Sequence, residues 1–126
     1  MTEKKAGNIL VIDDDPGVVR FLKNALELEG YRVSVATDGL QGLSSARQDE
    51  PDVVILDVML PGIDGYEVCR RLKAERITRY IPVMMLTVKD KKADREVGVR
   101  VGANEYLPKP IDLVDLMSAL DSLVGT

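Results

Sequence analysis

The chain alternates five times between a short apolar run and a longer segment whose apolar residues recur at helical spacing. The apolar runs lie near residues 8–13, 31–36, 53–57, 81–87 and 105–108. The helical segments lie near residues 16–29, 39–48, 65–75, 90–101 and 112–124. Strict strand–helix alternation with short connections is typical of a parallel sheet that helices cover on both faces. We therefore predict an α/β fold, a doubly wound (βα)5 sandwich.

The first and last helical segments carry the clearest apolar stripes. Asp15 and Pro16 are a start signal for the first helix, with Asp15 as its N-cap, and Gly30 is its stop signal. Its stripe consists of Val18, Phe21, Leu22, Ala25 and Leu26. The last helix follows an Asp112 cap, and its stripe consists of Leu113, Leu116, Met117, Leu120 and Val124. Such stripes pack against a core.

The character of each apolar run predicts its place in the sheet. The first, third and fourth runs are almost wholly apolar, as central strands are when both faces are buried. The second run alternates and the fifth is short, as edge strands are. Right-handed crossovers then favour the flavodoxin-like order 2-1-3-4-5, which puts the first and third strands side by side. Ligands of such sheets bind there, beyond the carboxyl ends of the strands.

Carboxylates follow the two strands that this order makes neighbours. Asp13 and Asp14 come after the first strand, and Asp57 comes after the third. Neighbouring strands lie about 4.8 Å apart, so these side chains should meet, and like charges at that range raise each other's pKa. Mg²⁺, which prefers oxygen ligands, would relieve the repulsion. Taken singly, Asp13 and Asp14 fit equally well as acids favoured by a helix N-terminus, whereas Asp57 precedes an open loop.

Two more side chains should reach the same edge of the sheet. Thr87 ends the fourth strand, and Lys109 follows the fifth. Each alone is more often an ordinary strand residue or a solvated lysine, but together with a cation they suit an anion with several oxygens, such as a phosphoryl group. Pro110 makes the Lys109–Pro110 bond a candidate for the cis form, which could aim the ammonium inward.

Composition excludes several classes of protein. The 126 residues are 45% hydrophobic and 30% charged, as in a soluble globular domain, and the net charge of −4 does not favour nucleic-acid binding. No apolar run approaches the roughly 20 residues of a membrane span, and no signal-peptide core follows Met1, so we expect a cytoplasmic setting. Because the chain has no histidine, Cys69 is expected to be a small, partly buried apolar residue rather than a nucleophile or half a disulfide.

Several of these motifs occur together in one known family. They are Ile12-Asp13-Asp14, Leu56-Asp57-Val58-Met59-Leu60-Pro61-Gly62-Ile63-Asp64-Gly65, Thr87, Gly102-Ala103 and Tyr106-Leu107-Pro108-Lys109-Pro110. Their combined spacing resembles the receiver domain of two-component response regulators, especially single-domain regulators of the chemotaxis type. The resemblance extends from about Asn8 to Val124 and implies one receiver domain over residues 1–126, with a core near 8–124 and a flexible segment 1–7. Members of the family have the flavodoxin-like strand order 2-1-3-4-5.

The resemblance implies a phosphoacceptor and a metal site. Asp57 would be the nucleophile that attacks the phosphoryl group of a phosphohistidine on a sensor histidine kinase or a histidine phosphotransfer protein. Asp14 would bind Mg²⁺ directly and Asp13 chiefly through water. Asp57 and the Met59 backbone carbonyl would complete the protein ligands.

The resemblance also implies roles for the residues around the acceptor. Thr87 and Lys109 would share the phosphoryl oxygens with Mg²⁺. Met59 and Lys89 match positions that tune hydrolysis of the acyl phosphate: Met59 could shield it from water, and Lys89 could fold over it or point into solvent. In the family, an inward move of the threonine hydroxyl accompanies inward rotation of an aromatic that matches Tyr106, although Tyr106 also fits an ordinary edge-strand aromatic.

The expected output surface is the face made by the fourth helix, the fifth strand and the fifth helix. Gly98 in the interior of the fourth helix costs about 1 kcal/mol relative to alanine, so this helix should shift easily. Phosphorylation would change this face and its contacts with a downstream effector protein or domain, and a phosphorylation-dependent dimer is left open. The domain itself would bind neither nucleic acid nor membrane. It would gain and lose its own phosphoryl group without being a turnover enzyme.

Three other classes of protein share part of this pattern. An enzyme of the haloacid-dehalogenase type also pairs Mg²⁺ with an aspartyl phosphate, but Gly17 stands where its motif has Thr or Val, Pro16 makes Asp15 a cap, and the chain is short for such an enzyme. A flavodoxin-like flavin protein needs a first loop rich in hydroxyls and glycine, and three aspartates there would repel the flavin phosphate. A phosphorylation-independent module on the same fold typically lacks some of the site residues, which are all present here.

Overall fold

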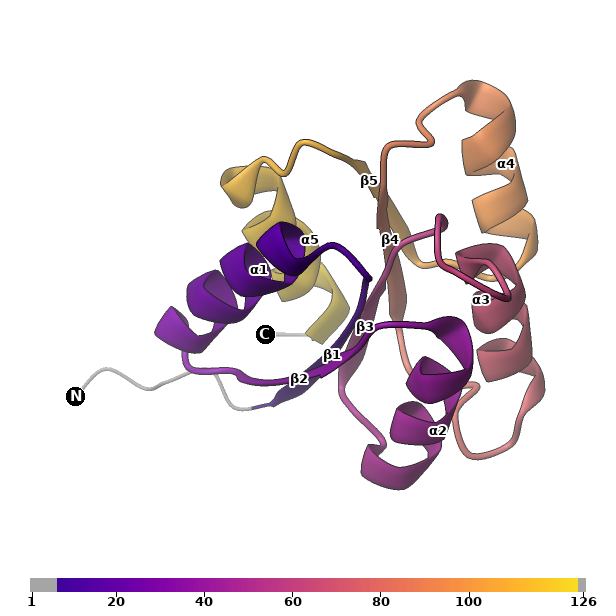
Figure 1. The fold of residues 1–126 in the computed structure, drawn as a ribbon, viewed down its shortest axis with the longest axis horizontal. Helices are drawn as coiled ribbons and strands as arrows, with labels where there is room; N and C mark the ends of the chain where they lie inside the picture. Colours follow the sequence, from indigo (N-terminus) through magenta and orange to yellow (C-terminus); the bar gives the residue numbers. More distant parts are fainter. Residues whose placement is uncertain (1–6, 125–126) are drawn as a thin grey trace.

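The computed structural model describes residues 7–124, so the flexibility predicted for residues 1–7 falls almost wholly outside the described part of the chain. Within that part, five strands and five helices alternate (Figure 1). The strands are β1 (Asn8–Ile12), β2 (Arg32–Ala36), β3 (Val53–Leu56), β4 (Val83–Thr87) and β5 (Glu105–Pro108). The helices are α1 (Pro16–Leu28), α2 (Gly39–Asp49), α3 (Gly65–Ala74), α4 (Lys92–Arg100) and α5 (Leu113–Val124).

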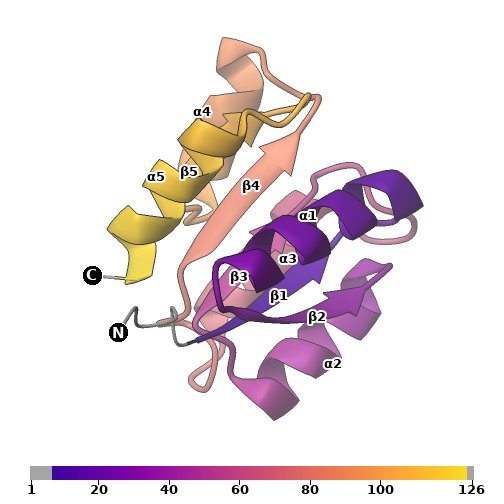
Figure 2. The same ribbon diagram turned by 90° about the vertical axis from the view of Figure 1, so that its left-hand side faces the viewer.

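The five strands form one parallel sheet in the order β2-β1-β3-β4-β5, which confirms the predicted order. In the register of the sheet, Ile12 at the end of β1 pairs with Ala36 of β2 and with Leu56 of β3. Helices α1 and α5 cover one face of the sheet, and α2, α3 and α4 cover the other (Figures 1 and 2). The carboxyl ends of β1 and β3 therefore lie side by side.

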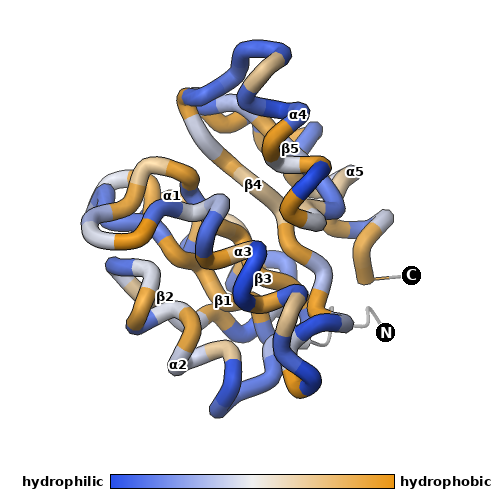
Figure 3. Tube along the Cα trace, turned by 90° about the vertical axis from the view of Figure 1, so that its right-hand side faces the viewer, coloured by the Kyte–Doolittle hydropathy of each residue, from blue (hydrophilic) through white to orange (hydrophobic). Residues whose placement is uncertain are grey.

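Alternate residues of the central strands enter two separate cores. Ile9 and Val11 of β1 belong to the core beneath α1 and α5, whereas Leu10 and Ile12 belong to the core beneath α2 and α3. Strands β3 and β4 are buried along their whole length, as their apolar sequences predict, and Figure 3 shows apolar residues along β4. Strand β2 alternates between exposed and less exposed residues, as an edge strand does.

The apolar stripes of α1 and α5 are only partly buried. Leu22 and Leu26 of α1 and Leu116 and Leu120 of α5 are fully buried, but Phe21 and Leu113 are exposed by 44% and 42%. They lie at the border of each stripe, where α1 and α5 face each other across a shallow groove that Met117 also lines.

Helix α4 is shorter than predicted. The sequence pattern favours a helix over 90–101, but the helix begins at Lys92, and residues 88–91 form the connection from β4. The Lys91 N–H donates to the Asp94 carboxylate at 3.2 Å, so the first turn has a local cap. None of the helices within residues 7–124 has the length and hydropathy needed to cross a membrane.

Cys69 lies in the interior of the protein. It is fully buried, not partly buried as predicted, and its Sγ donates to the Val101 carbonyl at 3.4 Å. Burial raises the pKa of the thiol to about 11. Cys69 therefore stays protonated near neutral pH and fills space in the core.

Candidate functional site

The sheet register brings the predicted acids together. Asp13 and Asp57 each follow the last residue of a strand, and the Asp57 N–H donates to the Ile12 carbonyl at 3.0 Å, which continues the β1–β3 ladder. Asp14 directly follows Asp13 in the sequence. Each of the three side chains places a carboxylate oxygen within 4.8 Å of the other two. The predicted cluster is therefore present at the carboxyl edge of the sheet.

The three acids differ in exposure. Asp13 and Asp57 are 2% and 6% exposed, whereas Asp14 is exposed to solvent. Burial raises the pKa of Asp13 above its usual range, although the Asp15 N–H, which donates to Asp13 Oδ1 at 2.9 Å, and the Lys109 ammonium both favour the charged form. Asp15 also caps α1 as predicted, because its Oδ1 accepts from the Gly17 N–H at 2.8 Å.

Lys109 lies between the two buried carboxylates. Its Nζ donates to Asp57 Oδ2 and forms an ion pair with Asp13 Oδ2, both at 2.9 Å. Burial disfavours the ammonium, but these two contacts outweigh it and raise the pKa of Lys109. The Lys109 N–H donates to the Thr87 carbonyl at 2.9 Å, and the Lys109–Pro110 bond, a candidate for the cis form, is cis.

A tight loop after β3 holds Asp57. The Met59 N–H donates to Asp57 Oδ1 at 3.0 Å, and the Gly65 N–H donates to the Val58 carbonyl at 2.8 Å. A Cβ on Gly65 would lie 2.2 Å from the Asp57 carbonyl oxygen, so only glycine fits there. The sequence pattern does not indicate this role for Gly65, because the contact depends on how α3 returns to β3.

Thr87 and Lys89, at the end of β4, belong to the same edge of the sheet as the acids. Thr87 is fully buried, and its Oγ1 accepts from the Lys89 N–H at 3.3 Å. The Lys89 Nζ lies 4.0 Å from Asp94 Oδ1, so the side chain extends toward α4 in this structure. Met59 is 52% exposed and, with Asp14 and Lys89, lines a shallow pocket beside the acids.

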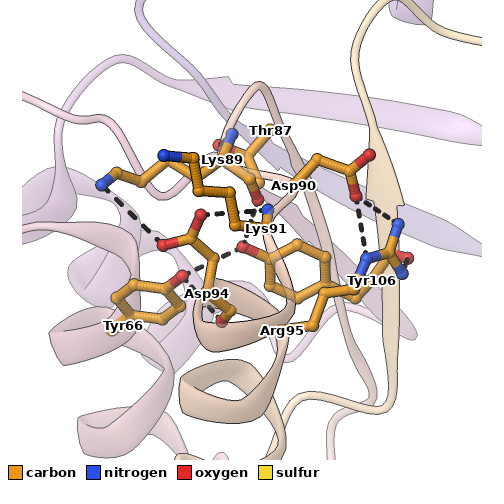
Figure 4. A network of polar contacts seen from close by, with 8 residues as sticks. All are labelled: Tyr66, Thr87, Lys89, Asp90, Lys91, Asp94, Arg95 and Tyr106. Atoms are coloured by element: carbon orange, nitrogen blue, oxygen red, sulfur yellow. Dashed lines mark hydrogen bonds and ion pairs between the residues drawn. The ribbon is translucent and has the colours of Figure 1, made fainter.

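Tyr106 of β5 points inward, toward the loop between β4 and α4 (Figure 4). Its hydroxyl donates to the Lys89 carbonyl at 2.6 Å and lies 3.0 Å from the Tyr66 hydroxyl. Burial raises the pKa of Tyr106, as does the contact with Tyr66, so the phenol keeps its proton. The guanidinium of Arg95 lies 5.3 Å from the centre of the Tyr106 ring. No motif in the sequence points to Tyr66 or Arg95, because their contacts with Tyr106 join residues that meet only in the fold.

The donor atoms of the cluster suit a hard divalent cation. All three side chains offer carboxylate oxygens, and the exposed Asp14 leaves the site open to water. Lys109 can balance only one of the three negative charges. Mg²⁺ is typically bound by one or two carboxylates together with several waters. The residues present therefore fit this ion.

The fold and the site agree with the comparison with known proteins. The sequence profile described as "Response regulator receiver domain" matches residues 9–121. The chain belongs to this family, whose members work in two-component signalling. The α/β fold with the strand order 2-1-3-4-5 is the CheY-like receiver fold.

Among characterised relatives, the chain is 47% identical over 118 residues to the response regulator PleD of Caulobacter vibrioides, covering 94% of this chain and 26% of PleD. It is 41% identical over 116 residues to the DNA-binding regulator RpaA of Synechocystis, covering 92% of this chain and 48% of RpaA. The chain thus spans between a quarter and a half of the length of these relatives.

Two solved structures share the fold. The receiver domain of the sensor histidine kinase PA1611 of Pseudomonas aeruginosa is 32% identical, with a TM-score of 0.89 over 97% of this chain and 100% of that chain, and its active-site cleft holds a magnesium ion. The chemotaxis protein CheY4 of Vibrio cholerae is 28% identical, with a TM-score of 0.88 over 94% of this chain and 99% of that chain.

Proposed function

We propose that this chain accepts a phosphoryl group on Asp57 as part of a two-component phosphorelay. The observation that carries the proposal is the surroundings of the Asp57 carboxylate. The Lys109 ammonium binds one of its oxygens at 2.9 Å and the Met59 N–H binds the other at 3.0 Å, beside two further aspartates. Two of these three carboxylates are buried, and burying like charges together costs folding free energy. A site that gathers charge in this way is better explained by the ligands it binds than by stability.

The donor would be a phosphohistidine on a sensor histidine kinase or a histidine phosphotransfer protein. A carboxylate oxygen of Asp57 forms a bond to phosphorus while the phosphorus–nitrogen bond breaks, and the imidazole leaves with that electron pair. The Thr87 hydroxyl and the Lys109 ammonium would bind phosphoryl oxygens. Such transfers depend mainly on alignment and on neutralisation of charge, and Lys109 already contacts the acceptor.

Asp13, Asp14, Asp57 and the Met59 carbonyl would hold Mg²⁺, with Asp14 binding it directly and Asp13 chiefly through water. When bound, the ion neutralises charge on the phosphoryl oxygens. The oxygen-only donor set supports this choice, and so does the magnesium ion in the PA1611 receiver domain.

Met59 and Lys89 would set the lifetime of the phosphorylated form. Met59 is half-exposed beside the acceptor, where it can shield the acyl phosphate from water. Lys89 lies near Asp94, so it would have to leave α4 to reach a phosphoryl group on Asp57.

The signal would leave through the face formed by α4, β5 and α5, with Thr87 and Tyr106 as the switch. This face would bind a downstream effector protein or domain, or a second phosphorylated copy. The setting would be cytoplasmic, residues 1–126 would act as one receiver domain that binds neither nucleic acid nor membrane, and the protein would not be a turnover enzyme. Equal amide-exchange protection of this face before and after phosphorylation would contradict this assignment.

The direct test is incubation with acetyl phosphate, with and without Mg²⁺, followed by intact-mass measurement. We expect the wild-type protein to gain one phosphoryl group only when Mg²⁺ is present. Asp57→Asn should gain none, because an amide is a poor nucleophile. The matched control is Asp49→Asn, which alters an exposed aspartate at the end of α2 and should gain the group normally.

The proposal fails if wild-type protein gains no Mg²⁺-dependent mass. It fails equally if Asp57→Asn is modified to the same extent as the Asp49→Asn control.

A further inference from the structure

Two tyrosine hydroxyls share three contacts beside the site (Figure 4). Tyr66 of α3 donates to the Asp94 carbonyl at 2.9 Å, and Tyr106 of β5 donates to the Lys89 carbonyl at 2.6 Å. The two hydroxyl oxygens lie 3.0 Å apart. Each hydroxyl has one proton, so the pair has two protons for three contacts. At any moment one of the three contacts lacks a proton.

The distances indicate how the two protons are divided. The contact from Tyr106 to the Lys89 carbonyl is the shortest, so Tyr106 donates there, and its oxygen remains free to accept a hydrogen bond. The Tyr66 proton is then shared between the Asp94 carbonyl and the Tyr106 oxygen. Asp94 lies in α4, where the helix satisfies such a carbonyl through the N–H four residues later. Tyr66 can therefore donate to Tyr106 without leaving that carbonyl unpaired.

The backbone of Lys89 connects the two tyrosines to Thr87 in the candidate site. The carbonyl of Lys89 accepts from Tyr106, and its N–H donates to Thr87 Oγ1 at 3.3 Å. A continuous series of hydrogen bonds thus runs from Tyr66 through Tyr106 and Lys89 to Thr87. Hydrogen bonds in series polarise one another, so a donor at one end strengthens the contacts that follow.

Helix α4 packs against the Tyr106 ring and holds it in the inward orientation. A Cβ on Gly98 would lie 2.7 and 2.8 Å from two ring carbons of Tyr106. Glycine at position 98 therefore lets α4 approach the ring more closely than a residue with a side chain would. The Arg95 Nη1 also donates to the Tyr106 carbonyl at 3.2 Å. The ring is therefore held by α4 from one side, while its hydroxyl meets Tyr66 of α3.

We propose that Tyr66 is a positioning residue for Thr87. By donating to Tyr106, the Tyr66 hydroxyl strengthens the hold of Tyr106 on the Lys89 peptide and so fixes the hydroxyl of Thr87. Because its single proton is shared with Asp94, a shift of α4 changes this hold. The role of Thr87 in phosphoryl transfer rests on the proposed function, but the effect of Tyr66 on Thr87 does not.

The test compares Tyr66→Phe, Tyr106→Phe and the double variant by amide hydrogen exchange, without phosphodonor or metal. The reporter is the Lys89 amide, because it donates to Thr87. Tyr66→Phe removes a hydrogen bond at the far end of the series, and one hydrogen bond is worth about 1 kcal/mol, or about fivefold in opening. We therefore expect Lys89 exchange to rise in Tyr66→Phe, by about fivefold at most. Adding Tyr66→Phe to Tyr106→Phe should cause no further rise, since both changes interrupt the same series.

The matched control is Tyr80→Phe. Tyr80 is 77% exposed and its hydroxyl accepts from Arg79 at 2.8 Å, so this variant also loses one hydrogen bond, but away from the network. Lys89 exchange should be unchanged in it. Amides of β1 should be unchanged in all single variants, since a general loss of stability would accelerate them too.

The proposal is overturned if Lys89 exchange in Tyr66→Phe equals that in Tyr80→Phe, or if the effects of Tyr66→Phe and Tyr106→Phe add. Slower exchange in Tyr66→Phe would also overturn it, since Tyr66 would then compete with Lys89 for the Tyr106 proton. The rate of phosphoryl uptake from acetyl phosphate should fall alongside the exchange change, by about fivefold at most. Wild-type protein that takes up no phosphoryl group would refute the proposed function, and the exchange data alone would then decide the role of Tyr66.

Discussion

For single residues such as Asp13, burial has a larger effect on the pKa of the carboxylate than the nearby Lys109 charge has. Asp13 and Asp14 are neighbours in sequence and identical in side chain, yet one is buried and the other is exposed. Burial raises the pKa of Asp13 even though Lys109 lies 2.9 Å away. The native protein therefore holds Asp13 charged at a cost that the unfolded chain does not have.

This cost predicts a pH-dependent effect of Asp13→Asn. The native protein binds the Asp13 proton more tightly than the unfolded chain, whose aspartates titrate near 3.8. The stability that this tighter binding contributes is fully present below pH 3.8 and is lost as the pH rises through the higher native pKa. Asparagine never becomes charged and can still accept from the Asp15 N–H. Asp13→Asn should therefore raise the free energy of unfolding more at pH 7 than at pH 3.5.

Urea denaturation of both proteins at the two pH values, in the presence of a chelator, checks this expectation. The same difference in the free energy of unfolding at both pH values would show that Asp13 charging is not linked to folding.

Among the elements, α4 shows why a residue unfavourable in a helix can still be required. From the sequence, Gly98 is expected to weaken the helix and let it shift. In the fold it also has a packing role, because any larger residue would collide with the Tyr106 ring. Helix propensity and packing therefore oppose each other at this position.

Gly98→Ala should reveal this opposition through a change of sign. In the wild-type background, it should lower the free energy of unfolding by about 1–2 kcal/mol, because the new methyl group overpacks the Tyr106 ring. In a Tyr106→Ala background the collision is gone, and alanine should raise the free energy of unfolding by up to about 1 kcal/mol. Urea denaturation of the four proteins measures both effects. A stabilising effect of Gly98→Ala in the wild-type background would contradict the close contact.

For the whole molecule, cation binding at this cluster would be linked to folding, because only the folded sheet brings Asp13 and Asp14 to Asp57. The two strand ends that meet there are more than 40 residues apart in the sequence. A cation that binds this cluster must therefore stabilise the folded chain over the unfolded one.

The linkage predicts that Mg²⁺ at about 100 times its dissociation constant raises the free energy of unfolding by about 2.7 kcal/mol. Asp14→Asn should remove most of this gain. Because Asp14 is exposed, the same change should alter the metal-free stability by less than about 0.5 kcal/mol. Chemical denaturation with MgCl₂ or EDTA measures both quantities, and Asp49→Asn is the control that should keep the gain. A gain that survives Asp14→Asn would place the cation elsewhere.

Periodicity and turn signals in the sequence determine much of this protein. The alternation of apolar runs and helical segments predicted all ten elements to within about two residues at each end. Strands β1, β3 and β4 are recognisable because a strand that is buried on both faces is almost wholly apolar. The acids after β1 and β3, together with Thr87 and Lys109, follow from the same pattern. The carboxyl ends of parallel strands share one edge of a sheet.

Only the tertiary structure decided what depends on distance between remote residues. The local pattern cannot show that Phe21 and Leu113 face a groove, that Gly65 must make room for the Asp57 carbonyl, or that the Tyr66 and Tyr106 hydroxyls meet. Each depends on how helices pack on the sheet, and side chains of the same type occupy very different surroundings there. The sequence by itself thus determined the elements and the carboxylates at their ends. Packing decided which of those carboxylates is buried, which is exposed, and which neighbours hold them.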